Sequence, residues 1–277
     1  MKCFCASYGD AIRFDKKPNE DFYLISKKFP IFIVADGVTR GHFSDGRYAC
    51  RYGAKKAAEI FCRTVLWELE NKFWEKGDVL QKIKYSFDLA NEKIKHLNTE
   101  EGIDKKLNYV EYDWLDTVGV VGLIQDKKLY YGYVGDCGLA IFDKKNNKKF
   151  QTEDMVADRV AGFANSHPSW YSYSKGKRRY LIKSQLRNSD NGQGYGTFSG
   201  QEGVKNYYVF GSKELSSQDM VVFYSDGFLE YLDGPKFVDI LRQENKRKLN
   251  NMMFWKILKN IFKYGHDRTL ISIKIEG

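Results

Sequence analysis

Ile31-Phe32-Ile33-Val34-Ala35-Asp36-Gly37 is an apolar run that leads directly into an acid and a glycine. An uninterrupted apolar run of this length is typical of a strand that is buried on both faces. The carboxylate of Asp36, held at the end of such a strand, has little freedom of position. Gly37 allows the chain to turn sharply, and it lets a backbone carbonyl approach whatever that carboxylate binds.

Three further aspartates stand at the ends of strand-like segments elsewhere in the chain. Each adjoins an apolar and aromatic run: residues 129–135 before Asp136, residues 220–225 before Asp226, and residues 269–275 after Asp267. If these strand ends converge, the acids form a dense cluster that cannot remain ionised without cations. Hard oxygen ligands favour Mg²⁺ or Mn²⁺. The sequence therefore predicts a magnesium or manganese centre built from acids that are far apart along the chain.

The composition indicates one sizeable, basic domain. The chain has 277 residues, 43% of them hydrophobic, and a net charge of +9, which suits phosphorylated substrates, nucleic acid or an anionic surface as well as plain solubility. The cysteine count is odd and no Cys-x-x-Cys occurs, which favours a reducing compartment over a disulfide framework or a zinc site. Because no apolar run approaches ~20 residues and no signal-peptide core is present, we expect a cytoplasmic protein with no membrane partner.

Strand-like and helical segments alternate in groups along the chain. An unbroken apolar stripe over residues 80–97 predicts a helix, and further helices are expected around residues 57–65, 235–244 and 254–262. A hairpin is expected around residues 125–127, and a second turn at 145–147. This order predicts an α+β fold in which two packed antiparallel β-sheets, a β-sandwich, are flanked by α-helices on both outer faces. We expect a single domain over residues 1–277, with an irregular flap-like insertion at about 151–203 that has a few strands of its own.

Five short motifs occur together in the order and context of one protein family. They are Asn19-Glu20-Asp21, Asp36-Gly37, Gly135-Asp136, Ser225-Asp226-Gly227 and Asp267-Arg268-Thr269. Together they resemble the metal-dependent type 2C (PPM-type) Ser/Thr protein phosphatases, over nearly the whole chain. That family has a β-sandwich flanked by helices with a two-metal centre at one end. The resemblance therefore implies hydrolysis of phosphoserine and phosphothreonine monoesters on proteins by a metal-activated bridging water.

Carried over residue by residue, the resemblance implies a ligand set for two Mn²⁺ or Mg²⁺ ions. Asp36 would bridge the ions, Asp226 and Asp267 would bind the first, and the Gly37 carbonyl and, through water, Glu20 would serve the second. Asp36 and Asp226 are thereby also the principal catalytic residues. A third, weaker metal position is matched by Asp136, Asp226 and Glu230, where Glu230 replaces an aspartate often found in the family.

The phosphate-binding part of the site departs from the family pattern. The family usually has an arginine three residues before the Asn-Glu-Asp motif, where it grips the substrate phosphate with two hydrogen bonds. Lys16 stands at that position and Arg13 three residues earlier. Because lysine is a point charge rather than a fork, either Arg13 binds the phosphate or the phosphate is bound more weakly. His42, which follows the Asp36-Gly37 motif, is a candidate general acid toward the leaving alkoxide.

Two other functions remain open at this point. A catalytically weak or inactive phosphatase-like domain that binds phosphoproteins or acts as a scaffold would fit the changed arginine. A nucleic-acid-binding module would fit the basic run at residues 175–179 and the aromatic residues at 170–173. That module is the more remote alternative, because acids at four strand ends would repel phosphates. The sequence does not fix the physiological substrate or the oligomeric state.

Overall fold

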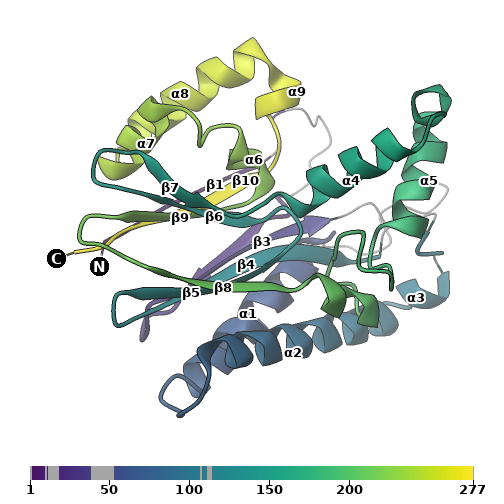
Figure 1. The fold of residues 1–277 in the computed structure, drawn as a ribbon, viewed down its shortest axis with the longest axis horizontal. Coiled ribbons are helices and arrows are strands. Elements are labelled where there is room, and N and C mark those ends of the chain that lie inside the picture. Colours follow the sequence, from purple (N-terminus) through teal and green to yellow (C-terminus); the bar gives the residue numbers. More distant parts are fainter. Residues whose placement is uncertain are drawn as a thin grey trace.

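The computed structural model describes residues 2–9, 11, 19–38, 53–106, 108–110 and 114–276. These residues form two five-stranded antiparallel sheets that lie face to face (Figure 1). In order across the first sheet, the strands are β1 (Lys2–Tyr8), β10 (Arg268–Lys274), β9 (Met220–Tyr224), β6 (Gly138–Phe142) and β7 (Lys148–Gln151). Across the second sheet they are β2 (Phe22–Ile25), β3 (Ile31–Val38), β4 (Asp116–Gln125), β5 (Lys128–Val134) and β8 (Val209–Glu214). Both predicted hairpins, β4–β5 and β6–β7, are confirmed.

The core between the sheets follows from the alternation of side chains along each strand. Phe32 and Val34 of β3 point inward and share one apolar cluster with Phe223 of β9, whereas Ile31 and Ile33 belong to the cluster on the other face of β3. β3 is therefore buried on both faces, as its apolar run predicted. Its last residues emerge at one end of the sandwich.

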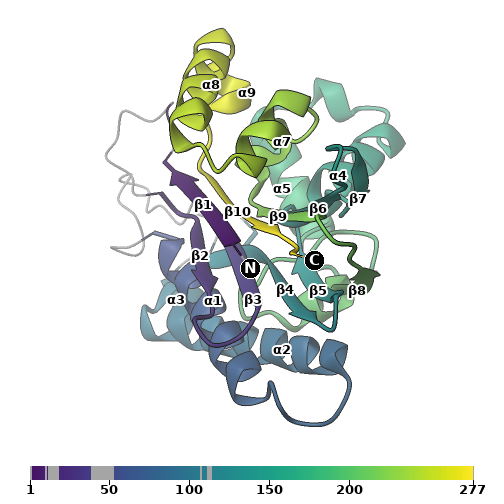
Figure 2. The ribbon, with the colours of Figure 1, turned by 90° about the vertical axis from the view of Figure 1, so that its left-hand side faces the viewer.

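Helices cover both outer faces of the sandwich, which confirms the predicted layers (Figures 1 and 2). α1 (Lys55–Asn71) and α2 (Val79–Glu100) pack on the second sheet, and α7 (Pro235–Arg242) and α8 (Lys246–Lys259) pack on the first. The shorter helices are α3 (Ile103–Lys106), α6 (Asp226–Leu229) and α9 (Ile261–Tyr264). Among the helices that the structure describes, none combines the length and the apolar content needed to cross a bilayer.

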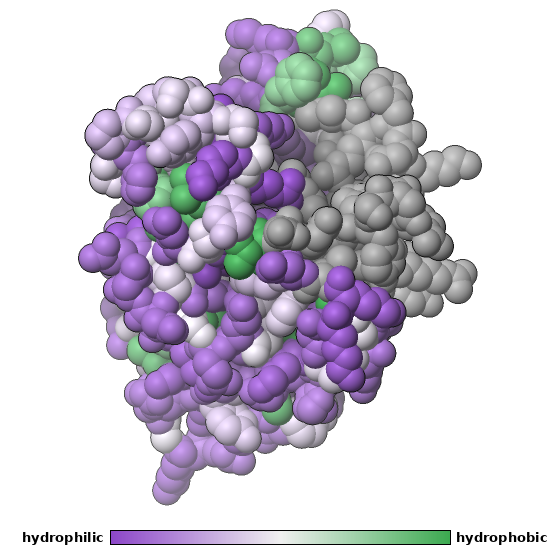
Figure 3. All heavy atoms as spheres, turned by 90° about the vertical axis from the view of Figure 1, so that its right-hand side faces the viewer, coloured by the Kyte–Doolittle hydropathy of each residue, from purple (hydrophilic) through white to green (hydrophobic). Residues whose placement is uncertain are grey.

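The helix expected around residues 254–262 is observed as the end of α8 and the start of α9, and large apolar side chains lie on its exposed side. Phe254, Leu258 and Phe262 suggested the helix, but their side chains are 57%, 62% and 76% exposed. Leu249 and Met253 are the residues that α8 buries against the core. Figure 3 shows apolar residues grouped at the top of the molecule, in the region of α8 and α9 in Figure 1. The helix is apolar on two sides, so periodicity alone could not identify its inner face.

Beyond Gln151, the last residue of β7, the expected insertion at 151–203 is largely helical. It holds α4 (Met155–Ser166), a 3₁₀ turn η1 (Trp170–Ser172) and α5 (Lys175–Gln185), and a second 3₁₀ turn, η2 (Glu202–Tyr207), straddles its end. The expectation of a few strands there was wrong, since the described residues show only isolated bridges. Two capping residues explain the helices: Asp154 accepts a hydrogen bond from Ala157 N at 2.8 Å and Ser174 accepts one from Lys177 N at 3.2 Å. α4 and α5 project from the end of the sandwich opposite the start of β1 (Figure 1).

An aromatic ring packs on each face of β4, and each ring lies against a glycine of that strand. A Cβ atom at Gly119 would lie 2.5 Å from the ring of Phe61 in α1, and a Cβ atom at Gly122 would lie 2.3 Å from the ring of Phe223 in β9. Both distances are far shorter than van der Waals contact. Only glycine leaves room for the rings at these two positions. The close contacts fix the position of α1 and of the first sheet relative to β4.

Candidate metal centre

Four chain segments bring the sequence-predicted acids to one end of the sandwich. Asp36 lies near the end of β3, Asp136 in the turn between β5 and β6, Asp226 at the start of α6 directly after β9, and Asp267 directly before β10. β9 and β10 are hydrogen-bonded neighbours, and Ser225 N donates to Thr269 O at 3.0 Å. The topology therefore places acids that are up to 231 positions apart in one region of the fold.

The close approach of Asp226 and Asp267 depends on Gly227. A Cβ atom there would lie 2.1 Å from the carbonyl oxygen of Asp267 and 2.7 Å from Cβ of Arg268. Only glycine lets these two backbone segments touch. The Asp-Gly dipeptide that marked this strand end in the sequence is thus required by packing as well as by the turn.

The acids act on one another electrostatically. Burial raises the pKa of Asp36 well above its ordinary value, and the negative charges of Asp21, Asp136 and Asp267 raise it further. The pKa of Asp226 is likewise raised, first by desolvation and then by Asp36 and Asp136, although its side chain still reaches solvent. Like charges perturb each other in this way only when they lie close together.

Asp136 belongs to the same electrostatic group. Desolvation raises the pKa of its carboxyl to about 6, followed by the charge of Asp154, while Arg187 acts in the opposite direction. Asp154 is the N-cap of α4 and its charge also raises the pKa of Asp226. The sequence prediction missed Asp154. An acid between a strand-like segment and a helix was the signal that could have found it.

The Asn19-Glu20-Asp21 motif, directly before β2, connects this group to the start of α1 and to the turn after β9. The backbone N of Glu20 donates to Asp267 Oδ2 at 3.2 Å, and Glu20 Oε1 accepts from Ala54 N at 3.2 Å. Asp21 is buried and its Oδ2 accepts from the hydroxyl of Ser225 at 2.7 Å. Burial raises the pKa of Asp21 to about 7 despite that hydrogen bond, and the charges of Asp226 and Asp267 add to the rise.

Other predicted site residues lie elsewhere or are not described. Glu230 is exposed and forms an ion pair with Lys263 of α9 at 2.8 Å, and it is not among the main charges that act on the clustered acids. The structure therefore does not bring Glu230 into the group. Arg13 and His42, together with Lys16, lie outside the described residues. Gly37 is buried in β3, where it pairs with Thr117 of β4.

The donor set suits hard divalent cations. The clustered groups are carboxylates, and desolvation followed by their mutual repulsion raises their pKa values. Within the described residues, Asp21 Oδ1 is a buried acceptor without a hydrogen-bond partner. Cations would relieve both conditions. Among the described residues, however, no group of three or more His, Cys, Asp or Glu side chains forms a ready-made metal cage. The residues fit a metal centre by chemistry and position rather than by a closed coordination shell.

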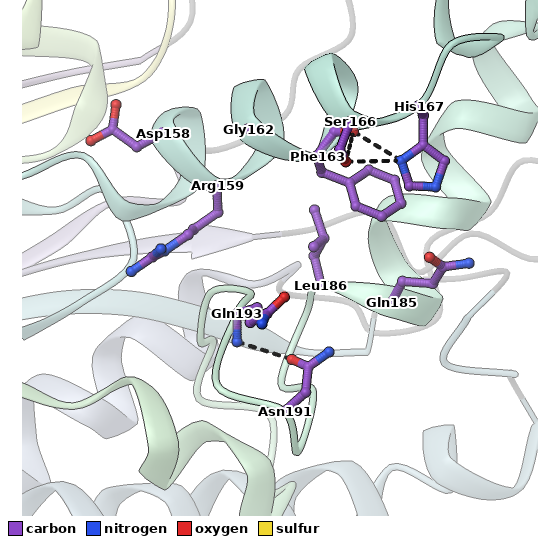
Figure 4. A pocket seen from close by; sticks show the side chains of 10 residues that line it. All are labelled: Asp158, Arg159, Gly162, Phe163, Ser166, His167, Gln185, Leu186, Asn191 and Gln193. Carbon is purple, nitrogen blue, oxygen red and sulfur yellow. Dashed lines mark hydrogen bonds between the residues drawn. The ribbon is translucent and has the colours of Figure 1, made fainter.

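One cavity lined by described residues lies apart from these acids. It has a volume of about 660 Å³ and is formed by α4, the end of α5 and the following loop (Figure 4). Its wall includes Arg159, Gln185 and Gln193, and His167 Nδ1 lies 2.9 Å from the carbonyl oxygen of Phe163. None of the clustered acids lines it.

Comparison with known proteins identifies the fold. No protein-family model and no curated protein sequence matches the chain, but many solved structures do. The catalytic domain of the Ser/Thr protein phosphatase PstP in complex with two manganese ions superposes with a TM-score of 0.63 at 15% identity, covering 99% of this chain and 98% of that one. Mycobacterium tuberculosis PstP/Ppp gives 0.59 at 16%, covering 100% and 99%. Staphylococcus aureus Stp1 gives 0.61 at 15%, covering 100% and 95%. From end to end, this chain has the fold of the PPM-type Ser/Thr protein phosphatases.

Proposed function

We propose that this chain is a metal-dependent protein phosphatase that hydrolyses phosphoserine and phosphothreonine monoesters on proteins. The observation that carries the proposal is the gathering of Asp36, Asp136, Asp226 and Asp267 at one end of the sandwich, where desolvation and then the neighbouring charges raise the pKa values of Asp36 and Asp226. The phosphatase fold supports it. A phosphate dianion would not approach bare carboxylates, so the acids make chemical sense only with cations between them and the substrate.

The residues have distinct roles in this proposal. Asp36, Asp226 and Asp267, with the Gly37 carbonyl and Glu20, would hold two Mn²⁺ or Mg²⁺ ions, and Asp136 would add negative charge for a third, weaker position. Bound metal ions would polarise the phosphoryl oxygens and lower the pKa of an attacking water. Asp21, which accepts a hydrogen bond from the hydroxyl of Ser225, would position the neighbouring Glu20. Arg13 remains the proposed phosphate ligand and His42 the proposed general acid.

The compartment and the role of Glu230 complete the proposal. The described cysteines are free thiols, which supports a reducing compartment such as the cytoplasm. Because Glu230 pairs with Lys263 at 2.8 Å, the proposed third metal position does not include it. That position would rest on Asp136 and Asp226.

The test is hydrolysis of para-nitrophenyl phosphate and of a phosphothreonine peptide with added Mn²⁺. We expect Asp226→Asn to abolish turnover while circular dichroism and the unfolding midpoint stay close to those of the parent. Asp233→Asn is the matched control, because its carboxylate is on the surface and pairs with Lys148. If Asp226→Asn turned over both substrates at the parent rate, the metal assignment would be refuted.

A scaffold role makes a different prediction for the same proteins. The incomplete metal cage among the described residues favours this second candidate. A scaffold would bind the phosphothreonine peptide with unchanged affinity in the parent and in Asp226→Asn, and neither protein would release phosphate at any Mn²⁺ concentration. Turnover by the parent that is lost on chelation and restored by Mn²⁺ excludes it.

A further inference from the structure

A second cavity, of about 550 Å³, lies between α5 and the end of β3. Its wall contains residues at one face of α5, spaced by three and four positions as in a helix, together with Val38, Trp170 and Arg187. The α5 residues are Lys175, Arg178, Arg179 and Ile182. Four of these seven lining residues are cationic and none is acidic. We call this cavity the basic pocket.

Part of this positive charge has no counterion among the residues that the structure describes. Arg187 is paired with the buried Asp116, whose Oδ2 lies 3.3 Å from its Nη1. Within the described residues, Lys175 and Arg178 make no ion pair, and Arg178 Nε is buried without a hydrogen-bond partner. A buried donor without a partner is costly, and an oxyanion is the ligand that satisfies a guanidinium best. The basic pocket is thus built to receive an anionic group.

The basic pocket adjoins the acids of the candidate metal centre. Val38 follows Asp36 by two residues on β3, so both side chains lie on the same face, roughly 7 Å apart along the strand. Arg187 lies at the same strand end, since its Nη1 is 3.3 Å from Oδ2 of Asp116, the residue of β4 that pairs with Val38. An extended substrate with one phosphate at the metal centre would bring a group one to three residues away to the pocket.

We propose that the basic pocket is an oxyanion subsite that selects substrates with a second anionic group, a phosphate or a carboxylate, within about three residues of the phosphate to be removed. This inference rests on the proposed phosphatase function. The apolar side chains of Trp170 and Ile182 in the wall strengthen it, because they limit water around the ion pair and so reduce its screening. A phosphate dianion should be preferred over a carboxylate, because it carries more charge and more acceptor atoms.

The experiment compares kcat/KM for release of the phosphothreonine phosphate from matched peptides. These peptides differ at the two positions on each side of the phosphothreonine. These positions carry alanine, glutamate or phosphoserine. We expect the parent to prefer phosphoserine over alanine by about tenfold or more, with glutamate between them, mainly through KM. The double variant Lys175→Gln/Arg178→Gln should lose this preference. It should turn over para-nitrophenyl phosphate, which cannot reach the pocket, at the parent rate.

Lys177→Gln is the matched control, since Lys177 lies on the same helix but contacts the ring of Tyr180 and does not line the pocket. It should keep the parent preference. If the double variant also kept that preference, the subsite would be refuted while turnover of para-nitrophenyl phosphate left the proposed function standing. If no protein turned over any ester, peptide binding measured by fluorescence anisotropy would decide. Equal binding of the doubly phosphorylated peptide by parent and double variant would overturn the inference, and so would tighter binding of single-stranded DNA than of that peptide.

Discussion

Replacing Gly227 by alanine should separate the two strand ends that carry Asp226 and Asp267. The added Cβ atom would lie 2.1 Å from the carbonyl oxygen of Asp267, and reaching the ordinary contact distance of 3.4 Å requires the backbones to move apart by about 1.3 Å. Because the obstructing atom is backbone, no side-chain rotation can relieve the contact. We expect Gly227→Ala to lower the free energy of unfolding by about 1–3 kcal/mol and to weaken Mn²⁺ binding, since both acids are proposed ligands of one ion.

Urea unfolding followed by circular dichroism measures the first effect, and isothermal titration with Mn²⁺ measures the second. Gly162→Ala is the control, because Gly162 lies within α4 and a Cβ atom there meets nothing within 4 Å. The same chemical change should stabilise that helix by about 0.5–1 kcal/mol. Opposite signs for the two substitutions would show that the contact with Asp267, and not alanine itself, causes the loss. A Gly227→Ala protein as stable as the parent, with unchanged Mn²⁺ affinity, would refute the reasoning.

Three further predictions concern the described core and its thiols. Arg187→Met leaves Asp116 buried without this cation, so urea unfolding should show a loss of about 3–5 kcal/mol, and a loss below 1 kcal/mol would contradict the pairing. Asn98→Leu removes an amide that makes three hydrogen bonds of 2.9–3.1 Å to backbone groups of two loops, which should cost about 2–3 kcal/mol; a neutral result would mean that the loops find other partners. Cys137 is buried, and burial raises its pKa well above the ordinary value, whereas Cys3 is exposed. A thiol reagent at pH 8 should therefore label Cys3 in the folded protein and Cys137 only after unfolding. Peptide mass spectrometry would show which thiol is labelled.

The sequence was sufficient to predict the layers because the relevant patterns are strong. The apolar run at residues 31–35 can be satisfied only where both faces are covered, and the stripe over residues 80–97 became α2, which extends from Val79 to Glu100. Turn residues at 126 and 127 adopt positive φ values of 50° and 60°, as a tight hairpin requires. The relative position of Asp36, Asp136, Asp226 and Asp267 was anticipated from the strand ends, although their metal-binding role stays a prediction.

Where prediction failed, the decisive information was not in the periodicity. α4 and α5 have few buried residues, so they show no apolar stripe. In the sequence, only the capping residues Asp154 and Ser174 indicate where these helices begin. α8 is apolar on two sides, and only its packing on the first sheet distinguishes Met253, which is buried, from Phe254, which is exposed. Glu230 matched a family position for a third metal, whereas its side chain pairs with Lys263 of α9 at 2.8 Å, a contact between two segments that the sequence alone could not bring together.

The two rings that enter β4 at Gly119 and Gly122 have a consequence for how an ion would be taken up. Asp36 belongs to one sheet and Asp226 follows the other, so the distance between them depends on how the sheets are aligned. Phe223 at Gly122 fixes that alignment by contact alone. The relative position of the two acids thus depends on the hydrophobic interior and not on a bound ion. If the proposed ions are bound, a chelator should remove them and leave a folded protein that can bind Mn²⁺ again.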